Sequence, residues 1–146
     1  MSRGKPIIIQ CGWIKRKFPK SAKIDFLDSP YQVISDYWIC RKYNPWYKAA
    51  LTDWDLFEWR EHHDCDNKAF LYWAHAQSAY GRFDDPAAQA MALGVIFYAP
   101  DEGDALHAIN FAFVGKKKEL KYIEPQKPGY VKLSRKERAS IYRVII

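Results

Sequence analysis

The chain has 146 residues, a formal net charge of +6 at pH 7, and 49% hydrophobic and 16% aromatic residues. This length suits one domain with a core of its own, and this apolar content excludes a disordered or fibrous chain. No apolar run reaches the length of a membrane span, and the three isoleucines of "PIIIQ" are too few for a secretory signal, so we expect a cytoplasmic protein with no membrane partner.

The first half of the chain combines weak and strong local signals. "PIIIQ" is typical of a strand, and "SPYQVISDYWICRKY" spaces its apolar residues roughly as a helix does. "TDWDLFEWREHH" predicts a helix capped by Thr52, with Asp53 and Asp55 in its first turn. A domain of this size cannot hide all of its aromatic surface, so we expect some rings to line a groove. The six tryptophans are Trp13, Trp38, Trp46, Trp54, Trp59 and Trp73.

Two more helices are expected further along the chain. One runs from about Cys65 to Tyr80 and ends at Gly81. It is apolar nearly all round, which is typical of a helix buried on most sides. The other begins in "DDPAAQAMAL", with Asp85 as its cap and Pro86 in the first position, where a missing N–H costs little.

After Gly94 the pattern changes to strands. "VIFYA", "ALHAINFAFV" and "ELKYIE" are strand-like and are separated by "PDEG" and "GKKK". Ser134 and Glu137 have the spacing of a capping box, and "IYRVII" predicts a last strand. We therefore expect a single α+β domain over residues 1–146, in which a helical part at about 30–93, with its buried central helix, packs on an antiparallel sheet at about 94–146.

Cys65 stands out because it follows a helix cap. With Asp64 as the cap, Cys65 lies in the first turn, where free N–H groups and the helix dipole favour a thiolate. Asp64 and Asp66 oppose this effect, so a cationic partner is needed, and a histidine is the natural one. Considered alone, Cys65 is as often a structural core cysteine. The three cysteines lack the number and spacing of a disulfide framework.

His107 is the histidine best placed to face Cys65. His62 and His63 are too close to Cys65 in sequence to reach over the helix start, and His75 lies far along the same helix. The stretch "HHDCD" also allows a metal cluster. Zinc sites usually repeat their ligands at fixed spacings, and no second cluster follows, so zinc ranks low.

The hairpin around "GKKK" suggests a partner for His107. If Val114 lies opposite Glu119, the register places Glu124 diagonally next to His107 on the same face of the sheet. A carboxylate there can orient the imidazole and stabilise its charged form. The predicted catalytic set is therefore Cys65 as nucleophile, His107 as base and acid, and Glu124 as the orienting group.

These three residues lie within a family resemblance. "DCDNKAF", "LHAINFAFV" and "YIEPQ" resemble the papain-like cysteine protease domain that follows the lectin domain of a fairy-ring mushroom agglutinin, and the stand-alone relatives of that domain in bacteria and phages. The resemblance covers roughly residues 64–126. It implies a papain-like fold and places the family's catalytic residues on Cys65, His107 and Glu124. Leu106 departs from it, since a small residue is expected before the histidine.

The resemblance also implies a calcium ion, for which Asp64 and Asp66 are candidate ligands, although no EF-hand loop is present. A glutamine for a papain-type oxyanion hole is missing before Cys65. The backbone N–H of Cys65 would need a second donor, either a backbone group or His63.

The leading functional hypothesis is a thiol hydrolase that cleaves peptide or amide bonds of a peptide or protein substrate through an acyl-enzyme. A cell-wall amidase and a thiol acyltransferase use the same constellation. A different class is a non-catalytic protein that binds nucleic acid or a protein partner, including a hydrolase fold retired to binding. We interpret the basic clusters as solvated turns and chain ends, which ranks nucleic acid low. They are Lys15, Arg16 and Lys17; Lys116, Lys117 and Lys118; and Arg135, Lys136 and Arg138.

Overall fold

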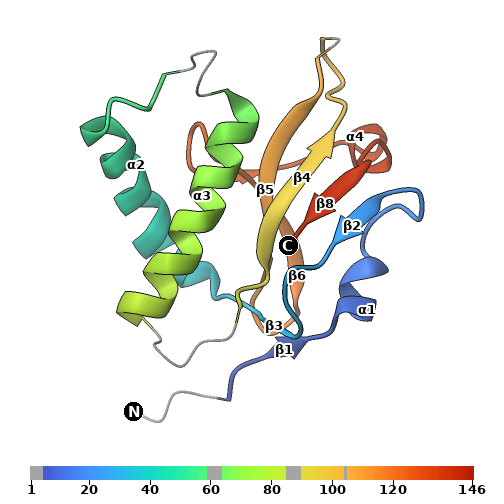
Figure 1. Cartoon of the computed structure of the whole chain (residues 1–146), viewed down its shortest axis with the longest axis horizontal. Coiled ribbons are helices and arrows are strands. Elements are labelled where there is room, and N and C mark those ends of the chain that lie inside the picture. The colour runs from blue at the N-terminus through green and yellow to red at the C-terminus, as the bar shows by residue number, and fades with distance from the viewer. Residues whose placement is uncertain (1–4, 59–63, 85–89, 104) are drawn as a thin grey trace.

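The computed structural model describes residues 5–58, 64–84, 90–103 and 105–146 (Figure 1). The helices are α1 (Cys11–Lys15), the π-helix η1 (Trp38–Tyr43), α2 (Asn44–Asp53), α3 (Cys65–Ala79), the π-helix η2 (Tyr80–Asp84) and α4 (Arg135–Ala139). The strands are β1 (Ile8–Ile9), β2 (Lys23–Asp25), β3 (Tyr31–Gln32), β4 (Leu93–Tyr98), β5 (His107–Val114), β6 (Glu119–Glu124), β7 (Gly129–Val131) and β8 (Arg143–Ile145).

The main sheet of the described residues has six strands in the order β2-β8-β4-β5-β6-β7, and β1 pairs separately with β3. The predicted α+β class is confirmed. The predicted purely antiparallel sheet is wrong, because β2 runs parallel to β8 and makes the sheet mixed. Strand β2 comes from the first fifty residues, where its three residues carry no alternation strong enough to predict it.

The predicted β5–β6 hairpin is confirmed in its register. Val114 lies opposite Glu119, and Asn110 lies opposite Ile123. Gly115 has a φ of 70° in the turn, a conformation that glycine adopts without steric cost. The predicted capping box at the start of α4 is also present, with Ser134 and Glu137 each bonding the other's backbone N–H.

The helix expected at Thr52 is wrong. Helix α2 begins at Asn44, with Pro45 in its first turn, and ends at Asp53, so Thr52 lies in its last turn. Tyr43, Tyr47 and Leu51 recur every four residues and are buried, which explains why the helix forms here. The end of the expected segment, residues 59–63, lies outside the described residues.

Helix α3 begins as predicted, with Asp64 as its cap, but it does not end at Gly81, because η2 continues the helical path to Asp84. For the third expected helix, Asp85 and Pro86 lie outside the described residues. Its described end is not helical, since β4 begins at Leu93. The β-branched and aromatic residues that follow Gly94 favour a strand, and this preference outweighs the helix signal of the preceding residues.

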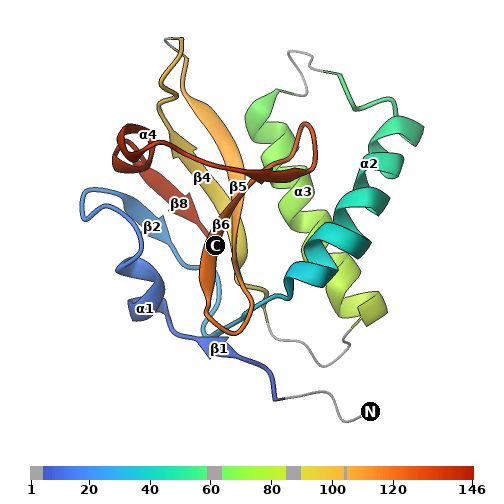
Figure 2. The same ribbon diagram turned by 180° about the vertical axis from the view of Figure 1, so that it is seen from behind.

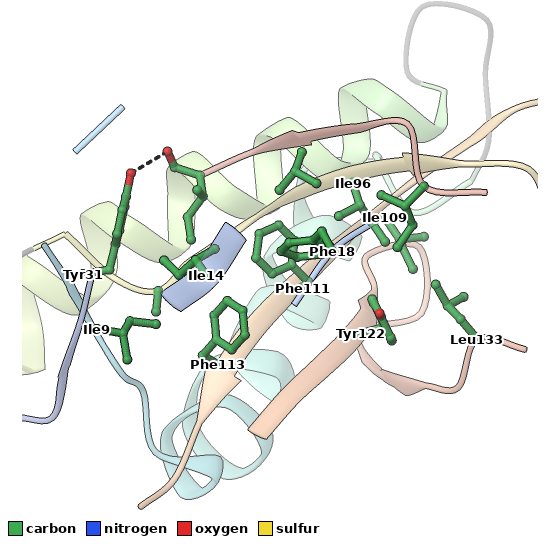
Figure 3. Close-up of a cluster of buried hydrophobic side chains, with 14 of the residues drawn as sticks. Ile9, Ile14, Phe18, Tyr31, Ile96, Ile109, Phe111, Phe113, Tyr122 and Leu133 are labelled. Atoms are coloured by element: carbon green, nitrogen blue, oxygen red, sulfur yellow. Dashed lines mark hydrogen bonds between the residues drawn. The ribbon is translucent and has the colours of Figure 1, made fainter. Parts of the chain in front are cut away.

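Among the described residues, the two largest clusters of buried hydrophobic side chains lie on opposite faces of the sheet. Helices α2 and α3 cover one face, and α1 lies on the other side (Figures 1 and 2). Strand β5 serves both cores, since Ala112 and Val114 belong to the helix side and Phe111 and Phe113 to the other. Figure 3 shows the α1 side, where the rings of Phe18, Phe111 and Phe113 meet edge to face.

Candidate functional site

An aromatic pocket of about 430 Å³ lies where η1, α2, the end of α3 and η2 meet. We call it the tryptophan pocket. Two tryptophans line it, which confirms that some rings border a groove. Its lining residues are Trp38, Lys42, Tyr43, Trp46, Ala79 and Asp84.

The inner wall of the pocket is a fixed pair of rings. Trp38 and Tyr43 stack with centroids 4.9 Å apart and planes 10° apart, and both are buried. Trp38 Nε1 donates to Asp84 Oδ2 at 2.7 Å, and Lys42 Nζ pairs with the other oxygen of the same carboxylate. The Asp84 carboxylate thus binds both the Trp38 indole and the Lys42 ammonium at the rim of the pocket. These two contacts limit the movement of the inner wall.

The outer wall is Trp46, which is 46% exposed. Its ring stacks on His75 of α3, with centroids 4.8 Å apart. The hydroxyl oxygen of Tyr43 lies 3.0 Å from His75 Nδ1, so the imidazole links the inner wall to the outer one. Burial lowers the pKa of His75 below its ordinary 6.5, so the ring is neutral at neutral pH.

Buried tyrosines support the pocket from below. The hydroxyl of Tyr72 donates to the side-chain oxygen of Asn44 at 2.6 Å, and that of Tyr43 lies 3.2 Å from the Tyr72 carbonyl oxygen. Burial raises the pKa values of Tyr43, Tyr47 and Tyr72, so all three stay neutral. The pocket therefore has apolar walls and a few polar groups that fix orientation, an arrangement typical of small-ligand sites.

The structure brings His107 and Glu124 together as predicted. His107 Nε2 lies 3.2 Å from Glu124 Oε2, and both side chains are partly buried. The other carboxylate oxygen of Glu124 accepts the backbone N–H of Gln126 at 3.0 Å, which fixes the carboxylate. The ring of Tyr98 meets His107 edge-on at 5.8 Å.

Cys65 does not join this contact. It packs against Ala69, Val95 and Ala108, on the α3 side of the sheet. Within the described residues no hydrogen bond links Cys65 to His107. The reason is strand alternation, because His107 and Ala108 point to opposite faces of β5. The roles of nucleophile and base stay predictions for these two residues.

Lys68, one turn after Cys65, is a buried cation that the sequence analysis missed. Its Nζ donates to the Phe57 carbonyl at 3.3 Å, which ties the chain after α2 to α3. Burial lowers the pKa of Lys68, and the nearby charge of Glu124 opposes that shift. The sequence around Lys68 does not reveal this burial. The helix is apolar on most sides, so its pattern does not separate a buried face from a solvent face.

Among the described residues, no three His, Cys, Asp or Glu side chains gather to hold a metal. The calcium and zinc hypotheses stay predictions. The backbone N–H of Asn67 donates to both Asp64 and Asp66, which therefore cap α3. His62 and His63, and with them the proposed oxyanion donor, lie outside the described residues. Among the described helices, none combines the length and apolarity needed to cross a membrane.

No family model matches the sequence, and no curated protein matches it. Two solved structures resemble the fold. One is described as the "PSL1a-E64 complex", with a TM-score of 0.64 and 19% identity over 95% of this chain and 50% of that chain. The other is Polyporus squamosus lectin bound to the human-type influenza-binding epitope Neu5Acα2-6Galβ1-4GlcNAc, with a TM-score of 0.56 and 22% identity over 86% of this chain and 42% of that chain.

These matches define an α+β chain that shares its fold with part of a lectin and spans half or less of the matched chains. They overturn the assignment to the papain-like cysteine proteases, since the structures that resemble this fold include a lectin bound to a sugar. The thiol hydrolase function, the amidase variant and the description as an enzyme with a catalytic triad are corrected with it.

Proposed function

We propose that this chain is a carbohydrate-binding protein and that its ligand occupies the tryptophan pocket. The proposed ligand is thus a glycan, and not the peptide substrate expected from the sequence. The observation that carries the proposal is the pair of tryptophan walls, Trp38 and Trp46, on either side of a pocket with a charged rim. One structure that resembles this fold is described as a lectin bound to a sialylated trisaccharide, which supports the class of ligand.

A sugar ring has an apolar face of C–H groups and an edge of hydroxyls. Aromatic rings attract the C–H face, because their faces carry partial negative charge. Trp46 offers its exposed ring at the pocket mouth, backed by His75, so the ring is already oriented before a ligand arrives. Lys42 and Asp84 lie at the rim, where hydroxyl groups can donate to the carboxylate and accept from the ammonium.

The volume of the pocket sets the size of the ligand. About 430 Å³ lies near the lower end of the range of small-molecule sites, which is roughly 300–1,000 Å³. We therefore assign one or two sugar rings to the pocket and leave further rings to the surface. The walls are held by hydrogen bonds in the free protein, so binding requires little ordering of side chains.

Calorimetric titration tests the proposal with Neu5Acα2-6Galβ1-4GlcNAc, with Galβ1-4GlcNAc, and with an immobilised glycan panel for other sugars. Trp46→Ala removes the outer wall and is expected to weaken binding at least about tenfold. Trp54→Ala is the matched control, since Trp54 directly follows α2 as its C-cap, is 45% exposed, contacts His75, and does not line the pocket. Equal losses in the two variants, or no binding across the panel, would overturn the proposal.

We also propose that Cys65, His107 and Glu124 belong to one functional group of residues, separate from the pocket, with no reaction assigned to it. The His107–Glu124 contact supports this, as does the position of Tyr98, whose pKa is raised to about 12, mainly by burial and in part by the charges of Glu137, Glu124 and Cys65. Tyr98 thus lies close enough to interact electrostatically with both Glu124 and Cys65.

A further inference from the structure

Two basic clusters that are far apart in sequence meet around one tryptophan. Lys17 Nζ lies 4.6 Å from the centroid of the Trp13 ring, and Lys118 Nζ lies 5.5 Å from it. Trp13 itself meets Phe113 edge-on at 5.2 Å, so the ring is anchored to the sheet. The clusters at residues 15–17 and 116–118, interpreted above as separate solvated turns, therefore form one surface.

The fold explains this meeting. Ile14 and Phe18 are buried in the core of the α1 side, which places the exposed end of α1 beside the sheet. The β5–β6 turn projects at the adjacent end of the hairpin and presents Lys116 and Lys117 to solvent. Each lysine over the Trp13 ring gains a cation–π contact, which partly offsets the repulsion between the two ammonium groups.

A basic groove continues from this turn. It has a volume of about 370 Å³ and lies along β6, where β7 has already ended at Val131. Tyr122 and Leu133 are buried beneath it, as Figure 3 shows for this end of the core. The groove is lined by Glu119, Leu120, Lys121, Tyr122, Val131, Lys132, Leu133 and Arg138.

Three cations and one carboxylate line the groove. Glu119 pairs with Lys121 at 3.1 Å, so these two charges offset each other and the net positive charge of the groove comes from Lys132 and Arg138. Arg138 Nη1 donates to the Leu133 carbonyl at 2.7 Å, which holds the guanidinium at the groove. Arg138 also belongs to the third basic cluster, on α4. All three clusters seen in the sequence therefore contribute to one surface, which we call the basic track.

We propose that the basic track binds a sulfated polysaccharide, a linear polyanion recognised by its charges. The track supplies point charges in series, at the end of α1, at the hairpin turn and along the groove. Proteins that bind single-stranded nucleic acid add exposed rings on which bases stack. Here Lys17 and Lys118 lie over the Trp13 ring, and the exposed tryptophans of the described residues, Trp46 and Trp54, lie on α2 and at its C-terminal cap. Charge without a stacking surface favours the polysaccharide.

The experiment measures binding of the full chain to heparin, to neutral dextran, and to single-stranded and duplex DNA of matched charge at several salt concentrations. The test variant combines Lys116→Gln, Lys117→Gln and Lys118→Asn, since asparagine tolerates the positive φ of 54° at Lys118. The control variant combines Arg41→Gln, Lys48→Gln and Lys127→Gln, which removes three exposed charges outside the track. Both variants have the same net charge.

We expect heparin binding that weakens with salt, a loss of at least about tenfold in the test variant, and a change of less than about twofold in the control. Trp46→Ala should leave heparin binding unchanged, which separates this site from the tryptophan pocket. Equal losses in the two triple variants would show attraction to net charge alone and overturn the proposal. Tighter binding of either DNA than of heparin at equal salt would also overturn it and assign the track to nucleic acid. Equal binding of neutral dextran and heparin would show that charge plays no part in recognition, and it would overturn the proposal as well.

Discussion

Trp46 of α2 and His75 of α3 stack with their ring centroids 4.8 Å apart, so the outer wall of the tryptophan pocket rests on a residue of the central helix. The same imidazole lies 3.0 Å from the Tyr43 hydroxyl, which belongs to the inner wall. One imidazole of α3 therefore contacts a residue of each wall of the pocket.

The stability of the protein should fall in mild acid because of His75. Burial lowers its folded pKa below 6.5, so as the pH drops below 6.5 the unfolded chain takes up a proton before the folded protein does. This contribution to the unfolding free energy is complete above the unfolded pKa and is lost between that value and the lowered folded pKa.

Urea unfolding of wild type and His75→Phe at about pH 7.5 and about pH 5.5 checks this expectation. We expect the wild type to lose more unfolding free energy on acidification than the variant, with quenching of tryptophan fluorescence by the charged ring. Parallel losses in the two proteins would show that carboxylates, and not His75, cause the acid sensitivity.

Gly94→Ala should be strongly destabilising. A Cβ there would meet the Ile145 carbonyl oxygen at 2.1 Å and the ring of Phe111 at 2.9 Å. The carbonyl belongs to β8, which pairs with β4, so relief requires separation of two strands. We expect a loss of at least about 2 kcal/mol in thermal or urea unfolding. Gly81→Ala is the control, since nothing lies within 4 Å of its added Cβ, and a similar loss there would contradict the explanation.

Asn110 should be a main link between α3 and the sheet. It is fully buried, and its side-chain nitrogen donates to the Ala69 carbonyl at 2.8 Å and to the Gly94 carbonyl at 3.1 Å. Asn110→Ala removes both bonds and is expected to cost about 2–3 kcal/mol. Asn110→Asp should cost more at neutral pH, because a buried carboxylate would face two carbonyl oxygens. Its deficit should shrink in acid, and a pH-independent deficit would argue against this geometry.

Thiol labelling tests whether Cys65, His107 and Glu124 act together. In a Cys11→Ser, Cys40→Ser background, only Cys65 can react with iodoacetamide. If the imidazole influences the thiol, His107→Ala should slow alkylation at least about threefold at neutral pH, and Glu124→Gln should slow it less. Unchanged rates in both variants, with folding verified by circular dichroism, would show that Cys65 is independent of the pair.

Local chemistry in the sequence was enough to predict the C-terminal half. The turn "GKKK" and the flanking strand residues predict the β5–β6 register, and from it the contact between His107 and Glu124. The Ser134 capping box likewise acts within four residues. Such features succeed because turn geometry and hydrogen bonding along a few residues fix them, whatever the rest of the chain does.

The helical half was harder to predict, because a local signal competed there with packing against residues distant in sequence. Asp53 and Asp55 suggested the start of a helix, whereas burial of Tyr43 and Tyr47 against Tyr72 of α3 placed the helix earlier. Strand β2 is too short to show alternation and exists through its pairing with β8. In both cases partners distant in sequence outweighed local propensity.

By itself the sequence determined the α+β class, the central hairpin and its register, and the presence of more aromatic surface than the core can hide. Apart from the contact between His107 and Glu124, which follows from the hairpin register, the tertiary structure alone decided which functional residues meet. It brings Trp38 to Asp84 and Lys17 to Lys118 around Trp13, and it turns His107 away from the face against which Cys65 packs. The physical reason is that hydrogen bonds and turns specify neighbours a few residues apart, whereas burial of apolar faces selects neighbours from the whole chain.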